Sequence, residues 1–139
     1  MKQPNGAWLP EHEKEPVMLG AGFRYQGSKL DRAMEILPAD RRDVALDIGS
    51  HVGLWTVQLS RLFKRVICFE PMPEHILCWY RNIEEQGVRN AMLHQFALGR
   101  ESGEAMMHED EWSSGKARIN GAGTVKVEVK RLDDFHVGQ

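Results

Sequence analysis

Two acidic residues, Asp47 and Glu70, each follow a short apolar run, which is the pattern of a residue at the end of a buried strand. The carboxyl ends of parallel strands lie along one edge of a sheet, where open α/β sheets bind their ligands. An ionised carboxylate offers acceptors to two neighbouring hydroxyl groups, so Glu70 is placed to bind the diol of a ribose. The pair therefore predicts a site for a nucleoside-type ligand.

The turn that follows Asp47 carries Gly49, His51 and Gly53. A dinucleotide fingerprint needs a glycine near the position of His51, because the backbone there must approach a pyrophosphate closely. Asp47 would repel phosphates but attract the ammonium or sulfonium group of a cationic ligand. The turn thus favours S-adenosylmethionine over a dinucleotide. A plainer alternative stays open, in which the acids only cap strands and the glycines only permit a turn.

Apolar runs and helical periods predict the elements that hold this site. The runs at 44–48, 66–70 and 91–97 are expected to be strands, and the spacing at 54–63 and 73–87 is expected to form helices. Strands that alternate with helices in this order predict a parallel sheet with right-handed crossovers. The fold class is therefore α/β, a Rossmann-like parallel sheet with flanking helices.

The N-terminal part has a different character. Residues 1–27 lack a helical or strand period and are expected to form an extended arm, followed by a single domain over residues 28–139. Ser28 and Asp31 have the spacing of a capping box, which predicts a helix that starts there and ends at Pro38.

The C-terminal part predicts a β-hairpin. Its two strands are expected at 104–108 and 124–130, the second with apolar and charged residues in strict alternation. The loop at 109–123 between them is long enough to be a functional lid or a mobile connection.

Composition limits the classes of function. The 139 residues suit one domain, and 18 basic against 20 acidic residues give a formal charge of -2, so there is no strong signal for nucleic-acid binding. No apolar run approaches the ~20 residues of a membrane helix and no signal peptide is evident, so a soluble, cytoplasmic protein is expected. Cys68 and Cys78 stand in apolar stretches and are expected to be reduced structural thiols.

Other residue types give weaker signals. No two histidines lie one helical turn apart beside an acid, so no metal site is expected. The histidines considered for this were His12, His75, His94, His108 and His136. Trp79 and Tyr80 lack interleaved basic residues and are expected in the core or an interface. Ser113 and Ser114 lack the sharp glycine turn of a serine nucleophile.

Four short motifs follow one another between residues 44 and 135. They are Asp47-Ile48-Gly49-Ser50-His51-Val52-Gly53-Leu54, Val66-Ile67-Cys68-Phe69-Glu70-Pro71, Phe96-Ala97-Leu98-Gly99 and Arg131-Leu132-Asp133-Asp134-Phe135. In this linked order they resemble the FkbM family of class I S-adenosylmethionine-dependent methyltransferases. The resemblance implies that S-adenosylmethionine binds as methyl donor and leaves as S-adenosylhomocysteine.

The resemblance also implies which residues hold the donor. The residues implied on the methionine side are Asp47, Gly49, Ser50 and Gly53, with His51 in the same loop. Those implied at the amino-acid end of the donor are Tyr25 and Gln26. Glu70 is implied at the ribose, and the residues implied around the adenine are Pro71, Met72, Ala97 and Leu98.

In that family the Leu-Asp-Asp segment is followed by further strands and helices, whereas only residues 136–139 follow here. We therefore expect a truncated class I methyltransferase-like fold, short in the half that binds the acceptor. It is either a minimal variant or is completed by another chain, with a homo-oligomer that completes the sheet edge or the acceptor site as one candidate. A hydroxyl acceptor would benefit from a base, for which the candidates are His51, Asp133 and Asp134.

The sequence thus predicts an enzyme, a methyltransferase that acts on an oxygen of a small-molecule or saccharide-like acceptor. A different class of function stays open, a non-catalytic module that binds S-adenosylmethionine or S-adenosylhomocysteine for sensing, sequestration or assembly. An NAD-binding oxidoreductase ranks third, because His51 occupies the position where a pyrophosphate site needs glycine.

Overall fold

A computed structural model describes residues 1–135 of the chain. Its first sheet is parallel, with the strand order β1-β2-β3, and consists of β1 (Val44–Ile48), β2 (Arg65–Phe69) and β3 (Ala91–His94). Asp47 pairs with Cys68, so the carboxyl ends of β1 and β2 lie level with each other. The mixed α/β class and the parallel sheet predicted from the sequence are confirmed.

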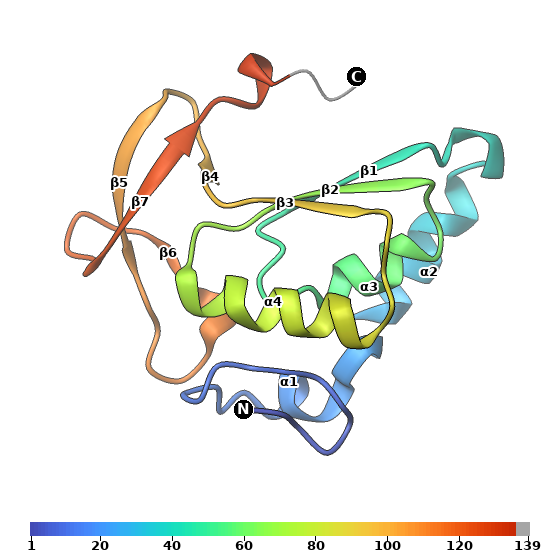
Figure 1. Ribbon diagram of the computed structural model, residues 1–139, viewed down its shortest axis with the longest axis horizontal. Helices are drawn as coiled ribbons and strands as arrows, with labels where there is room; N and C mark the ends of the chain where they lie inside the picture. Colours follow the sequence, from blue (N-terminus) through green and yellow to red (C-terminus); the bar gives the residue numbers. More distant parts are fainter. Residues whose placement is uncertain (136–139) are drawn as a thin grey trace.

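Three helices cover one face of this sheet (Figure 1). They are α2 (Gly27–Ile36), α3 (Leu54–Ser60) and α4 (Pro73–Glu85). Val57 and Trp79 bury their side chains against Val66 and Cys68 in the main core. The opposite face carries a smaller cluster around Phe69, onto which Leu132 and Phe135 pack.

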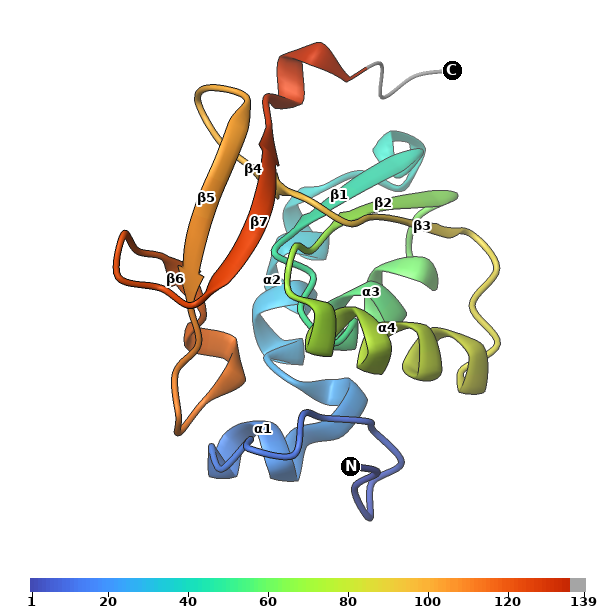
Figure 2. The ribbon, with the colours of Figure 1, turned by 60° about the vertical axis from the view of Figure 1, so that its left-hand side comes forward.

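A second sheet stands beside the first (Figure 2). It has the order β4-β7-β5-β6 and consists of β4 (Ala97–Leu98), β5 (Gly103–His108), β6 (Arg118–Ile119) and β7 (Val125–Lys130). β5 and β7 are antiparallel, which confirms the predicted hairpin. The strand expected over 91–97 is wrong in its extent, because β3 ends at His94 and the chain then crosses to pair with β7.

The N-terminal segment, residues 1–15, runs beneath α4, and Trp8 exchanges backbone hydrogen bonds of 2.7 and 2.9 Å with the side chain of Asn82. The extended arm expected over 1–27 is wrong beyond this point. The chain forms α1 (Pro16–Ala21) and the 3-10 turn η1 (Gly22–Arg24), with a proline in the first helical turn, where its missing N–H costs nothing.

Two helix ends also differ from expectation. The capping box at Ser28 is wrong, since α2 already starts at Gly27, after a left-handed Gln26, and makes no side-chain cap. Helix α3 ends at Ser60 rather than near Phe63, and the three residues that follow it form a turn. Three further 3-10 turns complete the chain: η2 (Ala39–Arg41), η3 (Ser114–Lys116) and η4 (Leu132–Asp134).

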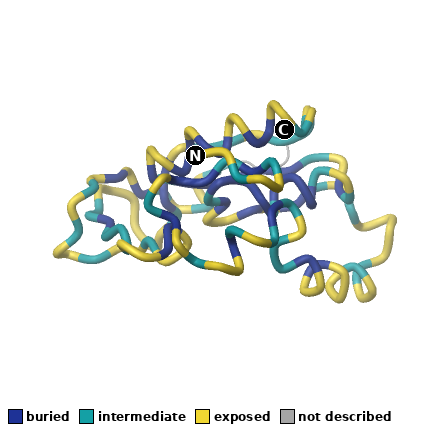
Figure 3. The backbone as a smooth tube through the Cα atoms, turned by 90° about the horizontal axis from the view of Figure 1, so that it is seen from below, coloured by how far each residue is buried: buried dark blue, intermediate teal, exposed yellow. Residues whose placement is uncertain are grey.

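Burial follows this layering. Buried positions gather in the middle of the molecule and exposed ones along its outer helix faces and loops (Figure 3). Cys68 and Cys78 are free and buried, as expected, and Trp79 is 2% exposed in the core. Among residues 1–135, no helix has both the length and the apolar character to cross a membrane.

Candidate functional site

The turn that the sequence singled out runs from the end of β1 to α3 and is hydrogen-bonded to the end of β2. The backbone N–H groups of Gly49 and Ser50 both donate to the carbonyl of Phe69, at 2.9 and 3.0 Å. The turn then bends sharply, with φ of 73° at Gly49 and 51° at His51. Such left-handed values suit glycine and are uncommon for other residues, so the position of His51 is held by its surroundings.

Two cavities meet at this turn. The Glu70 cavity, about 300 Å³, lies over the end of β2 and is lined by Glu70, Pro71, Ala97 and Leu98, among others. The Asp47 cavity, about 760 Å³, lies along β1 and is lined by Tyr25, Gln26, Asp47 and Ser50, among others. Ile48, Gly49, His51 and Gly115 line both. One elongated ligand could therefore occupy both cavities and pass over the turn.

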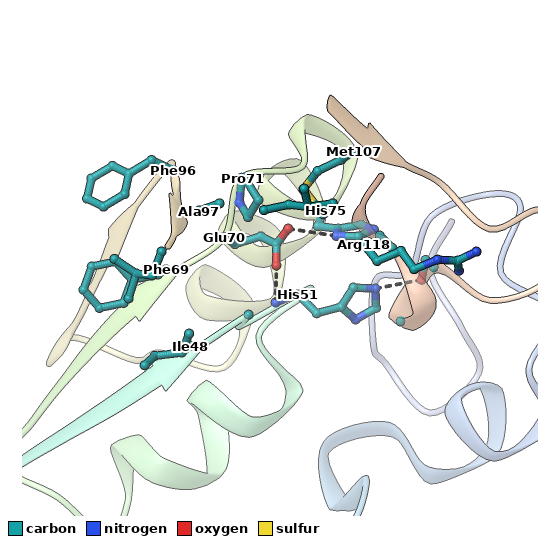
Figure 4. Close-up of a pocket in the computed structure, with 16 residues that line it drawn as sticks. Ile48, His51, Phe69, Glu70, Pro71, His75, Phe96, Ala97, Met107 and Arg118 are labelled. Carbon is teal, nitrogen blue, oxygen red and sulfur yellow. Dashed lines mark hydrogen bonds and ion pairs between the residues drawn. The ribbon is translucent and has the colours of Figure 1, made fainter. Parts of the chain in front are cut away.

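Glu70 is buried and accepts several hydrogen bonds from its own chain (Figure 4). One carboxylate oxygen accepts hydrogen bonds from the Met72 N–H at 2.9 Å and the His75 ring at 3.0 Å, and the other accepts the His51 N–H at 2.9 Å. A carboxylate has about four acceptor positions, so one is left for a ligand hydroxyl. Binding both hydroxyls of a ribose requires one of these three donors to move.

Asp47 has a different environment. Its carboxylate is buried and accepts a hydrogen bond from the Thr56 hydroxyl at 2.6 Å. Burial, reinforced by the nearby charge of Glu70, raises the pKa of Asp47 to about 6, although the Thr56 hydrogen bond opposes the shift. A cation in the Asp47 cavity would compensate this carboxylate and bring its pKa back down.

Ser50 supplies a second sign of a ligand in the Asp47 cavity. Its hydroxyl is buried and has no hydrogen-bond partner among the described residues. Buried hydroxyls without partners are rare in native structures, and a ligand group is one way to satisfy them. Near it, the amide of Gln26 donates to the Tyr25 hydroxyl at 3.2 Å, which places two further polar side chains at this cavity wall.

His51 connects the two cavities to a third element. Its Nε2 lies 2.7 Å from the Ser114 hydroxyl, and its ring meets that of His75 edge-on, with centroids 4.3 Å apart. Burial, together with the neighbouring His75 and His12, lowers the pKa of His51 well below its ordinary value. The imidazole is therefore neutral at pH 7 and able to accept a proton.

The structure brings most of the predicted donor residues together, and four predicted residues lie elsewhere. Met72 is 1% exposed and packs beneath the second sheet, outside both cavities. Gly53 also lies outside them; a Cβ atom there would come within 2.8 Å of Trp79, so this glycine serves packing. Asp133 and Asp134, in η4, line neither cavity, which leaves His51 as the base candidate.

Sequence reasoning missed several residues at the site. His75 was considered only as a metal ligand, yet it lies on the first turn of α4 and contacts Glu70. Met107, Ser114 and Arg118 reach the Glu70 cavity from the hairpin and its loop, the segment expected to be a lid or mobile. A long loop carries little local signal for its partner, so only the packing of the second sheet against the first identifies them.

One cluster bears on the expectation of no metal. His12 faces Glu74 through Nδ1 at 3.2 Å and Glu109 through Nε2 at 3.7 Å, and atoms of metal-ligand type in the three residues lie within 4.8 Å of one another. Each ring nitrogen of His12 therefore faces a different carboxylate. The expected absence of a metal stays a prediction, and His136 lies outside the described residues.

Sequence comparison finds similarity to a protein that is named as a methyltransferase. Methyltransferase 1 of Beauveria bassiana (strain ARSEF 2860) is 25% identical over 130 residues, which cover 76% of this chain and 52% of that protein. The chain thus spans about half the length of this relative. No protein-family model matches the chain, so the FkbM assignment stays a prediction.

Two solved structures are also similar. A DhpI–SAH complex has 32% sequence identity and a TM-score of 0.37, with 51% of this chain and 33% of that chain covered. A DhpI–SAM–HEP complex has 32% identity and a TM-score of 0.38, with 51% of this chain and 32% of that chain covered. TM-scores below 0.5 do not establish a common fold, so the fold rests on the chain's own strands.

Proposed function

We propose that this chain binds S-adenosylmethionine across the turn between β1 and α3 and acts as a methyltransferase on an oxygen acceptor. The observation that carries the proposal is the turn itself, where two cavities meet beside a buried acid and the unpartnered hydroxyl of Ser50. The sequence similarity to a methyltransferase over most of the chain supports the same reading.

The two cavities match the two ends of such a donor. Pro71, Ala97 and Leu98 give the Glu70 cavity an apolar wall for an adenine, and Glu70 offers its remaining acceptor position to a ribose hydroxyl. In the Asp47 cavity, the Asp47 carboxylate would attract the positive charges of the methionine end, and Ser50 would find a partner.

Within this proposal the donor supplies an activated methyl group on a sulfonium, so much of the catalysis can come from in-line positioning and the exclusion of water. The chain's own task is then to fix the donor and to take the proton that the acceptor hydroxyl releases. His51 is neutral, lines both cavities and is the base that we propose.

The acceptor class, the assembly and the compartment stay predictions. We propose a small-molecule or saccharide-like alcohol as acceptor. β1 pairs on one side with β2 and has no strand partner on its other side among residues 1–135. Open strand edges are normally covered, so a second copy of the chain is our candidate for that edge. Light scattering that shows a monomer would remove this candidate.

Calorimetry with S-adenosylmethionine, S-adenosylhomocysteine and NAD tests the donor. We expect both sulfur ligands to bind and NAD not to bind; binding of NAD alone would replace the proposal with the dinucleotide alternative. A tritiated-methyl assay on a panel of sugars and small alcohols then tests transfer. Donor binding without transfer to any of them would favour the non-catalytic module.

A further inference from the structure

A chain of buried polar groups runs from the N-terminal segment to His51. Glu13 is 3% exposed and Ser114 is fully buried, although they are far apart in the sequence. The N–H and the hydroxyl of Ser114 both donate to the same Glu13 oxygen, at 3.0 and 2.5 Å. The other Glu13 oxygen accepts the Glu15 N–H at 2.7 Å. The carboxylate is thus held from both sides.

This network determines which nitrogen of His51 carries the hydrogen. The Ser114 hydroxyl has a single hydrogen, which it donates to Glu13, so it can only accept from the His51 ring at 2.7 Å. Nε2 must therefore be the protonated nitrogen of the neutral ring. Nδ1 is left with a lone pair and has no hydrogen-bond partner among residues 1–135.

The free lone pair belongs to a residue that lines both cavities. The residue is also fixed at its backbone, where the N–H of His51 donates to Glu70 at 2.9 Å in a left-handed conformation. The ring is thus held at Nε2 and the backbone at the amide. Nδ1 is the ring nitrogen that no hydrogen bond within residues 1–135 engages.

We infer that Glu13 and Ser114 are positioning residues that hold His51 with Nδ1 as the proton acceptor for methyl transfer, an inference that rests on the proposed function. As the acceptor oxygen bonds to the methyl carbon, the carbon–sulfur bond breaks and its electron pair stays on sulfur. The hydroxyl proton passes to Nδ1. The imidazolium so formed is compensated by the Glu13 carboxylate through the Ser114 hydroxyl, and it later returns its proton to water.

Several charged or titratable groups surround the His51 ring and influence whether it is protonated. Glu70 at the end of β2 and His75 on α4 lie on one side, Glu13 and His12 lie on the N-terminal segment, and Arg118 of β6 lines the Glu70 cavity. His75, His12 and Arg118 disfavour a charged ring, whereas Glu13 and Glu70 favour it. The Glu13–Ser114 pair is the part of this set that also fixes the tautomer.

Nitrogen-15 NMR of the ligand-free chain tests the tautomer directly. We expect wild-type His51 to show a protonated Nε2 and an unprotonated Nδ1 at pH 8. Ser114→Ala removes the acceptor for Nε2–H, so its spectrum should shift toward a mixture of tautomers. Ser113→Ala is the matched control, because the Ser113 side chain takes part in no hydrogen bond that the described structure shows, and it should leave the spectrum unchanged.

Glu13→Gln tests the charge apart from the tautomer. The amide oxygen can still accept from Ser114, whereas the amide N–H₂ then meets the Glu15 N–H, so some loss of stability is expected. We expect the Nε2–H form to persist while an NMR titration shows the His51 pKa falling below its wild-type value. With an acceptor in hand, Ser114→Ala should lower kcat about tenfold and leave KM for the donor nearly unchanged. A structural role alone would lower the melting temperature and leave the tautomer in place.

The outcomes separate this inference from the proposed function. A wild-type ring protonated at Nδ1, or a Ser114→Ala spectrum identical to wild type, would overturn the positioning role even if S-adenosylhomocysteine binds. The expected tautomer in a chain that binds neither sulfur ligand would overturn the base role together with the proposed function.

Discussion

Asp47 and Glu70 lie at the ends of neighbouring strands and both carboxylates are buried, but they differ in the number of hydrogen bonds that they accept. Glu70 accepts three hydrogen bonds from its own chain, whereas Asp47 accepts one, from Thr56. Burial without further donors raises the pKa of Asp47 to about 6. Glu70 is therefore fixed by donors of the site itself, whereas Asp47 has a single donor, which leaves its charge for the cationic ligand that we propose.

The same isosteric change at the two acids should have opposite effects on stability. Glu70→Gln places an amide N–H₂ where the His51, His75 and Met72 groups already donate, so we expect the free energy of unfolding to fall by about 3 to 5 kcal/mol. Urea denaturation at pH 8 measures it. Unchanged stability would show that the three donors to Glu70 do not stabilise the fold and would contradict the difference between the two acids.

Asp47→Asn should instead stabilise the ligand-free chain. The amide oxygen still accepts from Thr56, and the uncompensated charge disappears, which is worth up to about 3 kcal/mol at pH 8 for a pKa raised from 3.8 to about 6. Affinity for S-adenosylmethionine should fall about tenfold or more, because the donor loses its charge partner. Calorimetry and urea denaturation on one preparation would show the two effects together.

The pH dependence of stability follows with a fixed sign. The folded state holds a proton on Asp47 up to about pH 6, whereas the unfolded chain loses it near pH 3.8. The contribution of Asp47 to the free energy of unfolding therefore falls as the pH rises between those values. The lowered pKa of His51 acts in the opposite direction. Its contribution to the free energy of unfolding is lost as the pH falls below the ordinary pKa of histidine. Subtracting the Asp47→Asn profile from wild type isolates the aspartate.

Ser50→Ala tests the Asp47 cavity and should have a smaller effect. The hydroxyl has no partner among the described residues, so its removal should leave stability unchanged or raise it by about 1 kcal/mol. Binding of S-adenosylhomocysteine should weaken by a similar amount if the hydroxyl contacts the ligand. A variant that loses stability but keeps its affinity would show that Ser50 has a structural partner instead.

Asp133→Asn and Asp134→Asn should give the smallest effects. Both residues lie in η4, away from the two cavities, and Asp133 forms an exposed ion pair with Arg131. Changes in stability and in donor affinity should stay within about 0.5 kcal/mol. A large loss of methyl transfer in either variant would return these residues to the candidate bases.

The sequence by itself determined the parallel sheet, the turn after β1 and the acids that end two strands, because apolar periodicity and glycine spacing are local signals. It also predicted the hairpin of β5 and β7 from alternation alone. The sequence did not predict the contacts between distant segments of the chain. The switch from β3 to β4 depends on pairing with β7, and a run of apolar residues cannot show which sheet it will join.

The hydrogen-bond partners of the acidic residues follow from the tertiary structure and not from the sequence pattern. Glu13 and Ser114 carry no motif and are far apart in the chain, yet they form a hydrogen-bonded path from the N-terminal segment through the hairpin loop to the ring of His51. The number of donors around Glu70 and Asp47 likewise depends on which groups fold over each strand end. Burial and partner count set a carboxylate's charge and freedom, and both are properties of packing rather than of residue type.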